Sequence, residues 1–110
     1  MQLEKKETFT LFLSDENSFS DFYNQFLIEE KKHTSENIVI QFSNNINITT
    51  EEFLLFLDIS ERKKQNGTSF VVIYLDIDVD DFPDNFNIVP TLQEAKDVIE
   101  MEDIERELGF

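Results

Sequence analysis

The sequence predicts an α/β fold with a mostly parallel sheet of about four strands. Short, almost wholly apolar segments alternate with segments whose apolar residues recur at helical spacing. The apolar segments show little polar alternation, which is typical of parallel strands covered on both faces. The 12 Phe suit one large core, and the 2 Gly and 2 Pro leave no flexible linker. Residues 1–110 are therefore expected to form a single domain.

The first part of the chain predicts a strand, a helix and a second strand. Residues 8–13 (TFTLFL) are β-branched and aromatic, and turn-forming residues follow them. From Ser18 to about Lys32, apolar residues recur at i, i+3, i+4 and i+7, as in an amphipathic helix. Residues 38–42 (IVIQF) then read as a buried strand.

The next part predicts a helix and two further strands. The apolar stripe that begins at Phe53 predicts one helix, which runs to Lys64 and ends where Gly67 permits a left-handed conformation. Residues 69–75 (SFVVIYL) form the most strand-like segment of the chain, and residues 86–89 predict a short last strand after an acidic loop.

A final helix is expected from Thr91, which gives the order β-α-β-α-β-β-α. The first part of its apolar stripe consists of Leu92, Ala95, Val98 and Ile99. The stripe then slips to Met101, Ile104 and Leu108. Because a straight helix keeps its apolar residues on one face, we expect a kink or a separate helix near Glu102.

The composition excludes several classes of partner and site. The net charge is −15, and residues 76–110 hold 12 acidic and only 2 basic residues. Such a surface repels phosphate groups, so nucleic acid and membrane surfaces are not expected as partners, whereas a basic partner or a metal is compatible with it. The absence of Cys excludes disulfides and thiolate zinc sites. No signal peptide or long apolar segment is apparent, which predicts a cytosolic protein.

The residues that commonly carry catalysis are scarce. The only His, His33, follows two lysines where the first helix ends. There it is expected to be a solvated end residue favoured by the helix dipole, not a general base. Since no Cys is present either, we expect a protein that is not an enzyme and needs no cofactor.

An acidic segment, residues 75–85 (LDIDVDDFPDN), follows the third strand. Asp76, Asp78 and Asp80 alternate there and are weak candidates for a divalent cation. The segment is not a calcium-binding EF-hand loop, because it has no Gly at the sixth position and Asn87 occupies the twelfth. We interpret it mainly as a strand end whose acidic side chains face water.

The polar segment at residues 43–52 is the main candidate site. Thr49 or Thr50 suits the N-cap of the next helix, and Thr-Thr-Glu-Glu fits a capping box. This explains the composition, although a helix N-terminus also attracts anions. The candidate partner-binding residues are Ser43, Asn44, Asn45, Thr49, Thr50, Glu51 and Glu52.

Residues 38–75 resemble a STAS domain, the fold of sulphate-transporter cytoplasmic tails and anti-sigma factor antagonists. In that family an apolar strand runs into Leu-Ser, Asp-Ser-Ser-Gly opens a helix, and a charged segment, Gly and another apolar strand follow. The segment IVIQFSNNINITTEEFLLFLDISERKKQNGTSFVVIYL has this layout. The resemblance implies a STAS-like sandwich and a regulatory role with a kinase-like or sigma-related protein partner.

In regulatory STAS proteins, a kinase-like partner phosphorylates the first Ser of Asp-Ser-Ser-Gly. Here Thr50 matches that Ser, while Thr49, Glu51 and Glu52 match the other three positions. The two Glu would repel a phosphate in the first helical turn. We therefore expect this chain not to be a working phosphoswitch, with the acidic side chains replacing the anion permanently.

Two expected features depart from the family. STAS domains have a pair of N-terminal strands before the first helix, whereas we expect one strand there. They also have a third helix between the last two strands, where this chain has its acidic loop.

The C-terminal segment, VPTLQEAKDVIEMEDIERELGF, resembles the tails of small bacterial proteins sometimes labelled ribonuclease Z. That enzyme is a zinc hydrolase with a His-rich metal cluster. A chain with 1 His cannot supply such a cluster, so the resemblance does not imply this activity.

Two function classes follow from the sequence. The leading hypothesis is a non-enzymatic cytosolic interaction module that binds its partner through residues 50–65 and the turn before them. The alternative is a small-molecule or divalent-metal binding domain at the carboxyl edge of the sheet, where open α/β sheets bind ligands. That edge would hold Ser43, Asn44, Asn45, Asp76 and Asp78. Homo-oligomerisation is left open.

Overall fold

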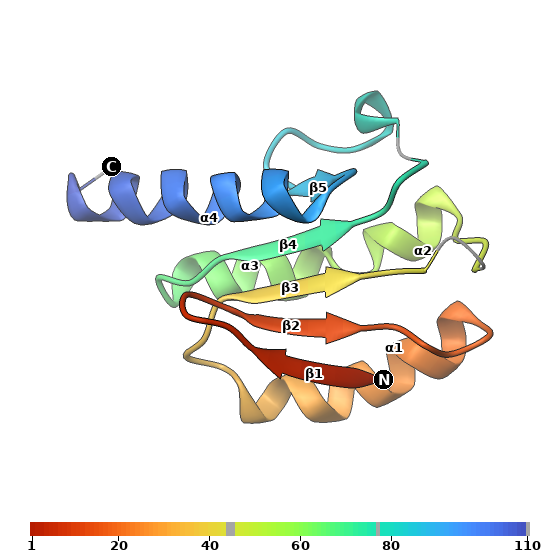
Figure 1. Cartoon of the computed structure of the whole chain (residues 1–110). Coiled ribbons are helices and arrows are strands. Elements are labelled where there is room, and N and C mark those ends of the chain that lie inside the picture. The colour runs from red at the N-terminus through yellow and green to blue at the C-terminus, as the bar shows by residue number, and fades with distance from the viewer. Residues whose placement is uncertain (44–45, 77, 110) are drawn as a thin grey trace.

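The chain folds into a mixed sheet with helices on both faces (Figure 1). The computed structural model describes residues 1–43, 46–76 and 78–109, and five strands lie side by side in chain order within these residues. They are β1 (Gln2–Lys5), β2 (Thr10–Leu13), β3 (Ile38–Gln41), β4 (Phe70–Ile73) and β5 (Ile88–Val89). β1 pairs antiparallel with β2, and the other neighbours are parallel. The predicted α/β class and the mostly parallel sheet are confirmed.

The helices divide between the two faces of the sheet. They are α1 (Phe19–Glu29), α2 (Thr50–Leu54), α3 (Leu57–Gln65) and α4 (Leu92–Glu107), with single 3₁₀ turns η1 (Glu30–Lys32) and η2 (Val79–Asp81). The crossovers from β2 to β3 and from β3 to β4 run in the same direction, so their helices α1, α2 and α3 share one face. α4 covers the other face. Within the described ranges, no helix is both long and apolar enough to cross a membrane.

The central strands bury both of their faces. Phe12, Ile40 and Val72 share one register position and pack toward α1–α3. Their neighbours Leu11, Val39 and Val71 point to the opposite face and pack with Ala95 and Ile99 of α4. This two-sided burial explains why these strands lack polar alternation.

The first strand of the sheet was missed by the sequence prediction. Instead of one strand before the first helix there is a pair, because β1 forms an antiparallel ladder with β2. All four β1 residues are exposed, and the segment QLEK carries a single apolar residue. It is defined by its ladder of hydrogen bonds and not by an apolar pattern, so nothing in its composition predicted it.

The prediction of a single helix after the polar turn is also wrong, because the segment is divided into α2 and α3 at Leu55 and Phe56. The backbone N–H groups of these two residues donate to Glu52 O and Phe53 O over 3.2 and 3.1 Å. Such bonds to the residue three positions earlier tighten the helix locally. The tightened turn still buries both Phe53 and Phe56.

The kink predicted near Glu102 does not occur, since α4 runs unbroken from Leu92 to Glu107. Its first apolar stripe is the buried face. The second stripe remains outside the core: Met101, Ile104 and Leu108 are 61%, 49% and 65% exposed. The slip in the sequence pattern therefore marks an exposed apolar surface and not a bend.

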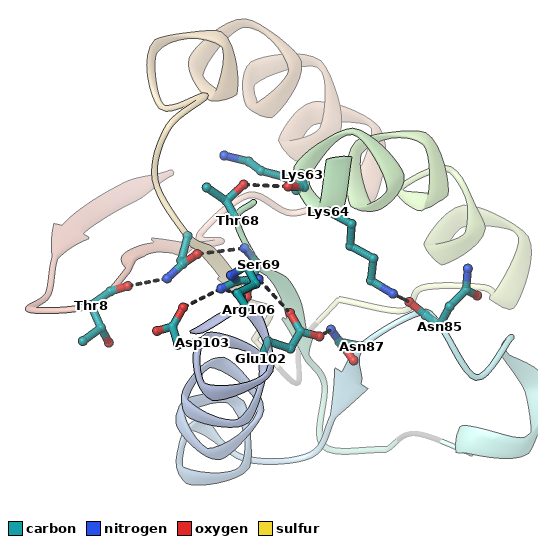
Figure 2. Close-up of polar contacts among 11 residues, drawn as sticks. Thr8, Lys63, Lys64, Thr68, Ser69, Asn85, Asn87, Glu102, Asp103 and Arg106 are labelled. Carbon is teal, nitrogen blue, oxygen red and sulfur yellow. Dashed lines mark hydrogen bonds and ion pairs between the residues drawn. The ribbon is translucent and has the colours of Figure 1, made fainter. Parts of the chain in front are cut away.

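A chain of hydrogen bonds joins α4 to the amino edge of the sheet (Figure 2). Asn37 Nδ2 donates to Thr8 O over 2.9 Å, and Asn37 Oδ1 accepts from Ser69 N over 2.8 Å. Arg106 Nη2 then donates to Ser69 Oγ over 3.1 Å and also pairs with Asp103. We call this series the amino-edge chain. It links the β1–β2 turn, the starts of β3 and β4, and α4.

Candidate functional site

The carboxyl edge of the sheet gathers the polar segments that the sequence singled out. β2, β3 and β4 all point to this edge, and α2 and the loop that leads to η2 lie beyond it (Figure 1). Because parallel strands end at the same edge, the turn after β3 and the acidic loop after β4 become neighbours. This is the position where open α/β sheets usually bind their ligands.

Aromatic packing holds these two loops together. The ring of Phe53 in α2 lies 5.8 Å from that of Phe42, 5.2 Å from that of Tyr74 and 5.9 Å from that of Phe82. The Tyr74 hydroxyl donates to Ile46 O over 2.9 Å. Phe53 thus anchors the start of α2 against both loops, and Tyr74 fixes the described part of the polar turn.

Thr49 is the N-cap of α2, which confirms the predicted capping box. Its Oγ1 accepts from Glu52 N over 3.2 Å, and Glu52 Oε1 accepts from Thr49 N over 3.0 Å. Thr50 is the first residue of the helix and is half-buried, whereas Glu51 is exposed. Glu52 therefore has a structural role in the cap, and Glu51 is free to face a partner.

A small hollow of about 120 Å³ lies between α2 and the acidic loop. It is lined by Ile48, Thr50, Phe53, Tyr74, Asp76, Asp78, Asp81 and Phe82. The structure thus brings the predicted Thr50 together with the predicted Asp76 and Asp78. Asp81 joins them although the sequence reading did not include it, because η2 folds the loop back toward α2.

The remaining predicted residues lie beside the hollow or outside the described part of the chain. Ser43 is half-buried just past the end of β3. Asp80 is exposed, and its backbone N–H donates to Asp78 Oδ1 over 3.1 Å. Asn44 and Asn45 fall outside the described residues.

The acidic loop does not form a metal centre among the residues whose placement is described. No group of three or more His, Cys, Asp or Glu side chains there could hold a metal ion. The weak candidates Asp76, Asp78 and Asp80 are therefore not gathered into one ligand set in this part of the chain. Together with Glu51, they create a negative field at the carboxyl edge, which attracts basic groups and repels anions.

A buried polar cluster at the opposite edge was not anticipated from the sequence. Lys63 is 3% exposed, and its Nζ donates to His33 O and Glu36 O over 2.7 and 2.6 Å. Burial lowers the pKa of Lys63, although the charges of Glu30 and Glu36 partly oppose this. The surrounding sequence, ERKK, reads as a solvated helix end, so only the packing of α3 against the turn after η1 shows this contact.

His33 belongs to the same cluster, which corrects the prediction that it is a solvated end residue. Its side chain is only 19% exposed and lies 2.8 Å from Glu36 Oε2 and 3.6 Å from Glu29 Oε1. Its ring packs edge-on against Phe12 at 5.5 Å. The hydrogen bond from Thr10 Oγ1 lowers the pKa of Glu36, and the neighbouring His33 adds to this effect. Two carboxylates and an aromatic core residue thus hold the imidazole at the sheet edge.

No protein-family model matches this chain, and no curated protein matches it.

Proposed function

We propose that this chain is a non-enzymatic, STAS-like regulatory module that binds a protein partner through the carboxyl edge of its sheet. The contact surface consists of the polar turn, the start of α2 and the acidic loop. The observation that carries the proposal is the shared hollow, in which Thr50 lies beside Asp76 and Asp78. Two segments about 25 residues apart in the chain thus form one surface at the edge where α/β sheets bind.

The N-terminal strand pair and the helix start support the STAS-like part of this proposal. A STAS domain has two strands before its first helix, and β1 with β2 supplies such a pair. The family's phosphorylatable Ser opens a helix at the position of Thr50, which is the first residue of α2 here. The acidic loop contains only the single turn η2 where the family has a third helix.

The side chains of the hollow favour recognition over catalysis. Its polar lining consists of the Thr50 hydroxyl, the Tyr74 hydroxyl and three carboxylates. Tyr74 already donates its hydroxyl hydrogen to Ile46 O. An activated nucleophile needs an adjacent general base, and no His or Lys is among the described residues that line the hollow. The lining therefore suits charge and shape complementarity with a partner.

The same geometry supports the absence of a phosphoswitch. A phosphate on Thr50 would lie in the hollow with Asp76 and Asp78 and next to Glu51. The negative charges of the phosphate and of these carboxylates would repel one another, so phosphorylation at Thr50 is disfavoured. Mass spectrometry of protein from its native cell should find Thr50 unmodified, and stoichiometric phosphorylation there would contradict this proposal.

The partner should present basic side chains to this edge. The resemblance to STAS domains implies a kinase-like or sigma-related protein, and the acidic loop adds a requirement for Lys or Arg on its surface. Because exposed charges act mainly on association rate, binding should be faster at low salt.

The test is a pull-down from native lysate with the double variant Thr50→Arg and Glu51→Arg. The matched control is Ser20→Arg with Asp21→Arg, which makes the same changes in charge in the first turn of α1. Ser20 and Asp21 are both exposed, whereas Thr50 is half-buried and Glu51 is exposed. Circular dichroism should show that both variants remain folded. A specific partner held by the wild type and the control but lost from the Thr50 and Glu51 variant would support the proposal. A partner retained by that variant would show that the carboxyl edge is not the contact surface.

The second candidate function is binding of a small molecule or divalent cation in the same hollow. The observation that favours a small molecule is the polar lining by Asp76, Asp78 and Asp81 beside the Thr50 hydroxyl. A divalent cation is less favoured, because the described residues hold no group of three or more acidic side chains that could bind a metal ion. Calorimetry with Ca²⁺, Mg²⁺ and common nucleotides tests it, with Asp76→Asn and Asp78→Asn as the variants. If none of these ligands produces a binding heat, this candidate is removed and the interaction role stands alone.

A further inference from the structure

A groove of about 620 Å³ separates the β1–β2 turn from one side of α4. Its apolar lining consists of Phe9, Leu92, Ile99 and Ile104. Phe9 and Ile99 are almost fully buried and form its floor, whereas Ile104 is 49% exposed and forms part of its wall. The accessible apolar side chains of the groove are therefore the half-buried Leu92 and the exposed Ile104. The groove lies at the opposite edge of the sheet from the proposed binding surface.

The apolar surface continues from the groove over the helix. Met101, Ile104 and Leu108 lie within about 60° of one another around α4, because successive residues rotate by about 100°. This face points away from Ala95 and Ile99, which pack on the sheet. Ile104 belongs both to this face and to the groove, so the exposed apolar face of α4 borders the groove.

The rim of the groove is acidic. Its charged residues are Lys6, Glu7, Lys96, Glu100, Asp103 and Glu107. Lys6 pairs with Glu4 at 3.0 Å, and Asp103 pairs with Arg106. Within the part of the chain that the structure describes, Glu7, Glu100 and Glu107 form no ion pair. Lys96 is the only base of the rim outside such a pair there, so the rim carries an excess of uncompensated negative charge.

The two walls of the groove are fixed relative to each other. The amino-edge chain runs from Thr8 in the turn, through Asn37 and Ser69, to Arg106 and Asp103 on α4 (Figure 2). Thr8 and Asp103 also line the groove. A partner therefore meets walls that are already in place, and a preformed site loses less entropy on binding than one that must be ordered.

We infer that this groove binds a basic amphipathic segment of a partner protein. The apolar side chains of the segment would pack on Leu92 and Ile104 above the buried floor of the groove. Its Lys or Arg side chains would face Glu7, Glu100 and Glu107. Exposed acidic residues around an apolar groove match a basic amphipathic helix in both shape and charge. A second copy of this chain is a poor occupant, because each copy carries a net charge of −15 and residues 91–110 contribute seven acidic and two basic side chains.

The probe is a fluorescein-labelled 18-residue peptide of Leu and Lys patterned as an amphipathic helix, and the comparison peptide has Glu in place of Lys. We expect fluorescence anisotropy to show binding of the Lys peptide and not of the Glu peptide. Increasing the salt concentration from about 0.05 to about 0.5 M should weaken binding of the Lys peptide, because exposed charges are screened. Equal binding of both peptides, or no binding of the Lys peptide, would overturn the inference.

Two pairs of variants locate the binding surface. Ile104→Gln should weaken binding of the Lys peptide about fivefold, as expected from losing part of an isoleucine contact. Ile28→Gln is the matched control, since Ile28 is an exposed isoleucine of α1 on the other face of the sheet. Glu100→Gln with Glu107→Gln should reduce the salt dependence, whereas Asp21→Asn with Asp58→Asn changes the net charge equally at exposed positions outside both surfaces.

Amide chemical shifts in a nuclear magnetic resonance titration separate this inference from the proposed function. Shifts confined to residues 6–9 and 92–107 support the groove. Shifts confined to residues 46–54 and 74–82 would assign the peptide to the carboxyl edge and overturn the inference. Sedimentation equilibrium adds a further test: a dimer of the wild type that Ile104→Gln abolishes would show that the face is covered by a second copy.

Discussion

At the scale of single residues, the amino edge depends on buried polar groups more than the sequence suggests. Lys63 and Lys64 are neighbours in α3, yet one is buried and the other exposed. Lys63 Nζ donates to two carbonyl oxygens of the turn that leads into β3, and Lys64 Nζ donates to Asn85 O over 2.7 Å in an exposed position. Two adjacent lysines should therefore differ greatly in their contribution to stability.

Replacing Lys63 with Met should lower the free energy of unfolding by about 2 kcal/mol, because the carbonyls of His33 and Glu36 lose their partner. Lys64→Met is the control, and its effect should be about 0.5 kcal/mol or less, as is usual for exposed side chains. Urea unfolding followed by circular dichroism measures both. Equal effects of the two variants would show that the buried hydrogen bonds do not stabilise the fold.

Glu36 should make the stability of the fold depend on pH. Its pKa is lowered in the folded state, first by the Thr10 hydroxyl and then by His33. A lowered pKa stabilises the protein above the unfolded pKa of Glu, about 4.3, and this contribution is lost as the pH falls through the lower folded value. The difference in stability between wild type and Glu36→Gln should therefore shrink as the pH falls from about 5 through the lowered folded pKa of Glu36.

Thr10→Val tests the named cause of this pKa shift, since it removes the hydroxyl but keeps the shape of a buried side chain. It should reduce the pH dependence that Glu36 contributes, as measured by urea unfolding across the same pH range. If the pH dependence of Thr10→Val equals that of the wild type, the hydroxyl is not the main cause.

At the scale of elements, α2 shows how a short helix is specified. A helix of 5 residues is too short to be stable from its own hydrogen bonds, so it depends on its cap and on the burial of Phe53. Thr49 provides the cap together with Glu52. The identity of the N-cap residue should thus affect the whole candidate site, because α2 places Thr50 in the hollow.

Thr49→Ala should lower the free energy of unfolding by about 1 kcal/mol, the usual effect of losing a Thr N-cap. Thr50→Ala is the matched control, because Thr50 follows the cap and its side chain has no part in the capping box. Thermal unfolding followed by circular dichroism compares the two variants. A loss of stability as large for Thr50→Ala would indicate that capping is not the cause.

At the scale of the whole molecule, the fold carries a large excess of negative charge. A net charge of −15 on 110 residues destabilises the compact state through self-repulsion. Within the described residues, ion pairs involve 8 of the 24 acidic residues, and several of these pairs are partly exposed and contribute little. Long-range repulsion should therefore be the dominant electrostatic effect on stability near neutral pH.

Adding NaCl should raise the melting temperature at pH 7, because the Debye length falls from about 30 Å at 0.01 M to about 10 Å at 0.1 M. The expected rise is largest at the low end of the salt range and then levels off. Differential scanning calorimetry at several salt concentrations measures it. A melting temperature that falls with salt would show that local ion pairs outweigh the general repulsion.

The sequence by itself determined the strands and helices whose residues are buried. Residues 38–40 and 70–73 are apolar throughout, as is typical of strands covered on both faces, so composition alone predicted these strands. The α2 cap was equally predictable, since a capping box involves four consecutive residues. These features are local, and their physical cause lies within the segment itself.

Only the tertiary structure decided the features that depend on residues far apart in the chain. β1 exists because of its ladder with β2. The hollow exists because the segments that carry Thr50 and Asp76 follow β3 and β4 at the same edge of the sheet. The slip in the α4 stripe predicted a kink, but α4 is unbroken, and Ile104 is exposed because it lies on the face of the helix that points away from Ala95 and Ile99. Periodicity shows that a residue is apolar, whereas packing decides whether a neighbour covers it, because coverage depends on segments distant in sequence.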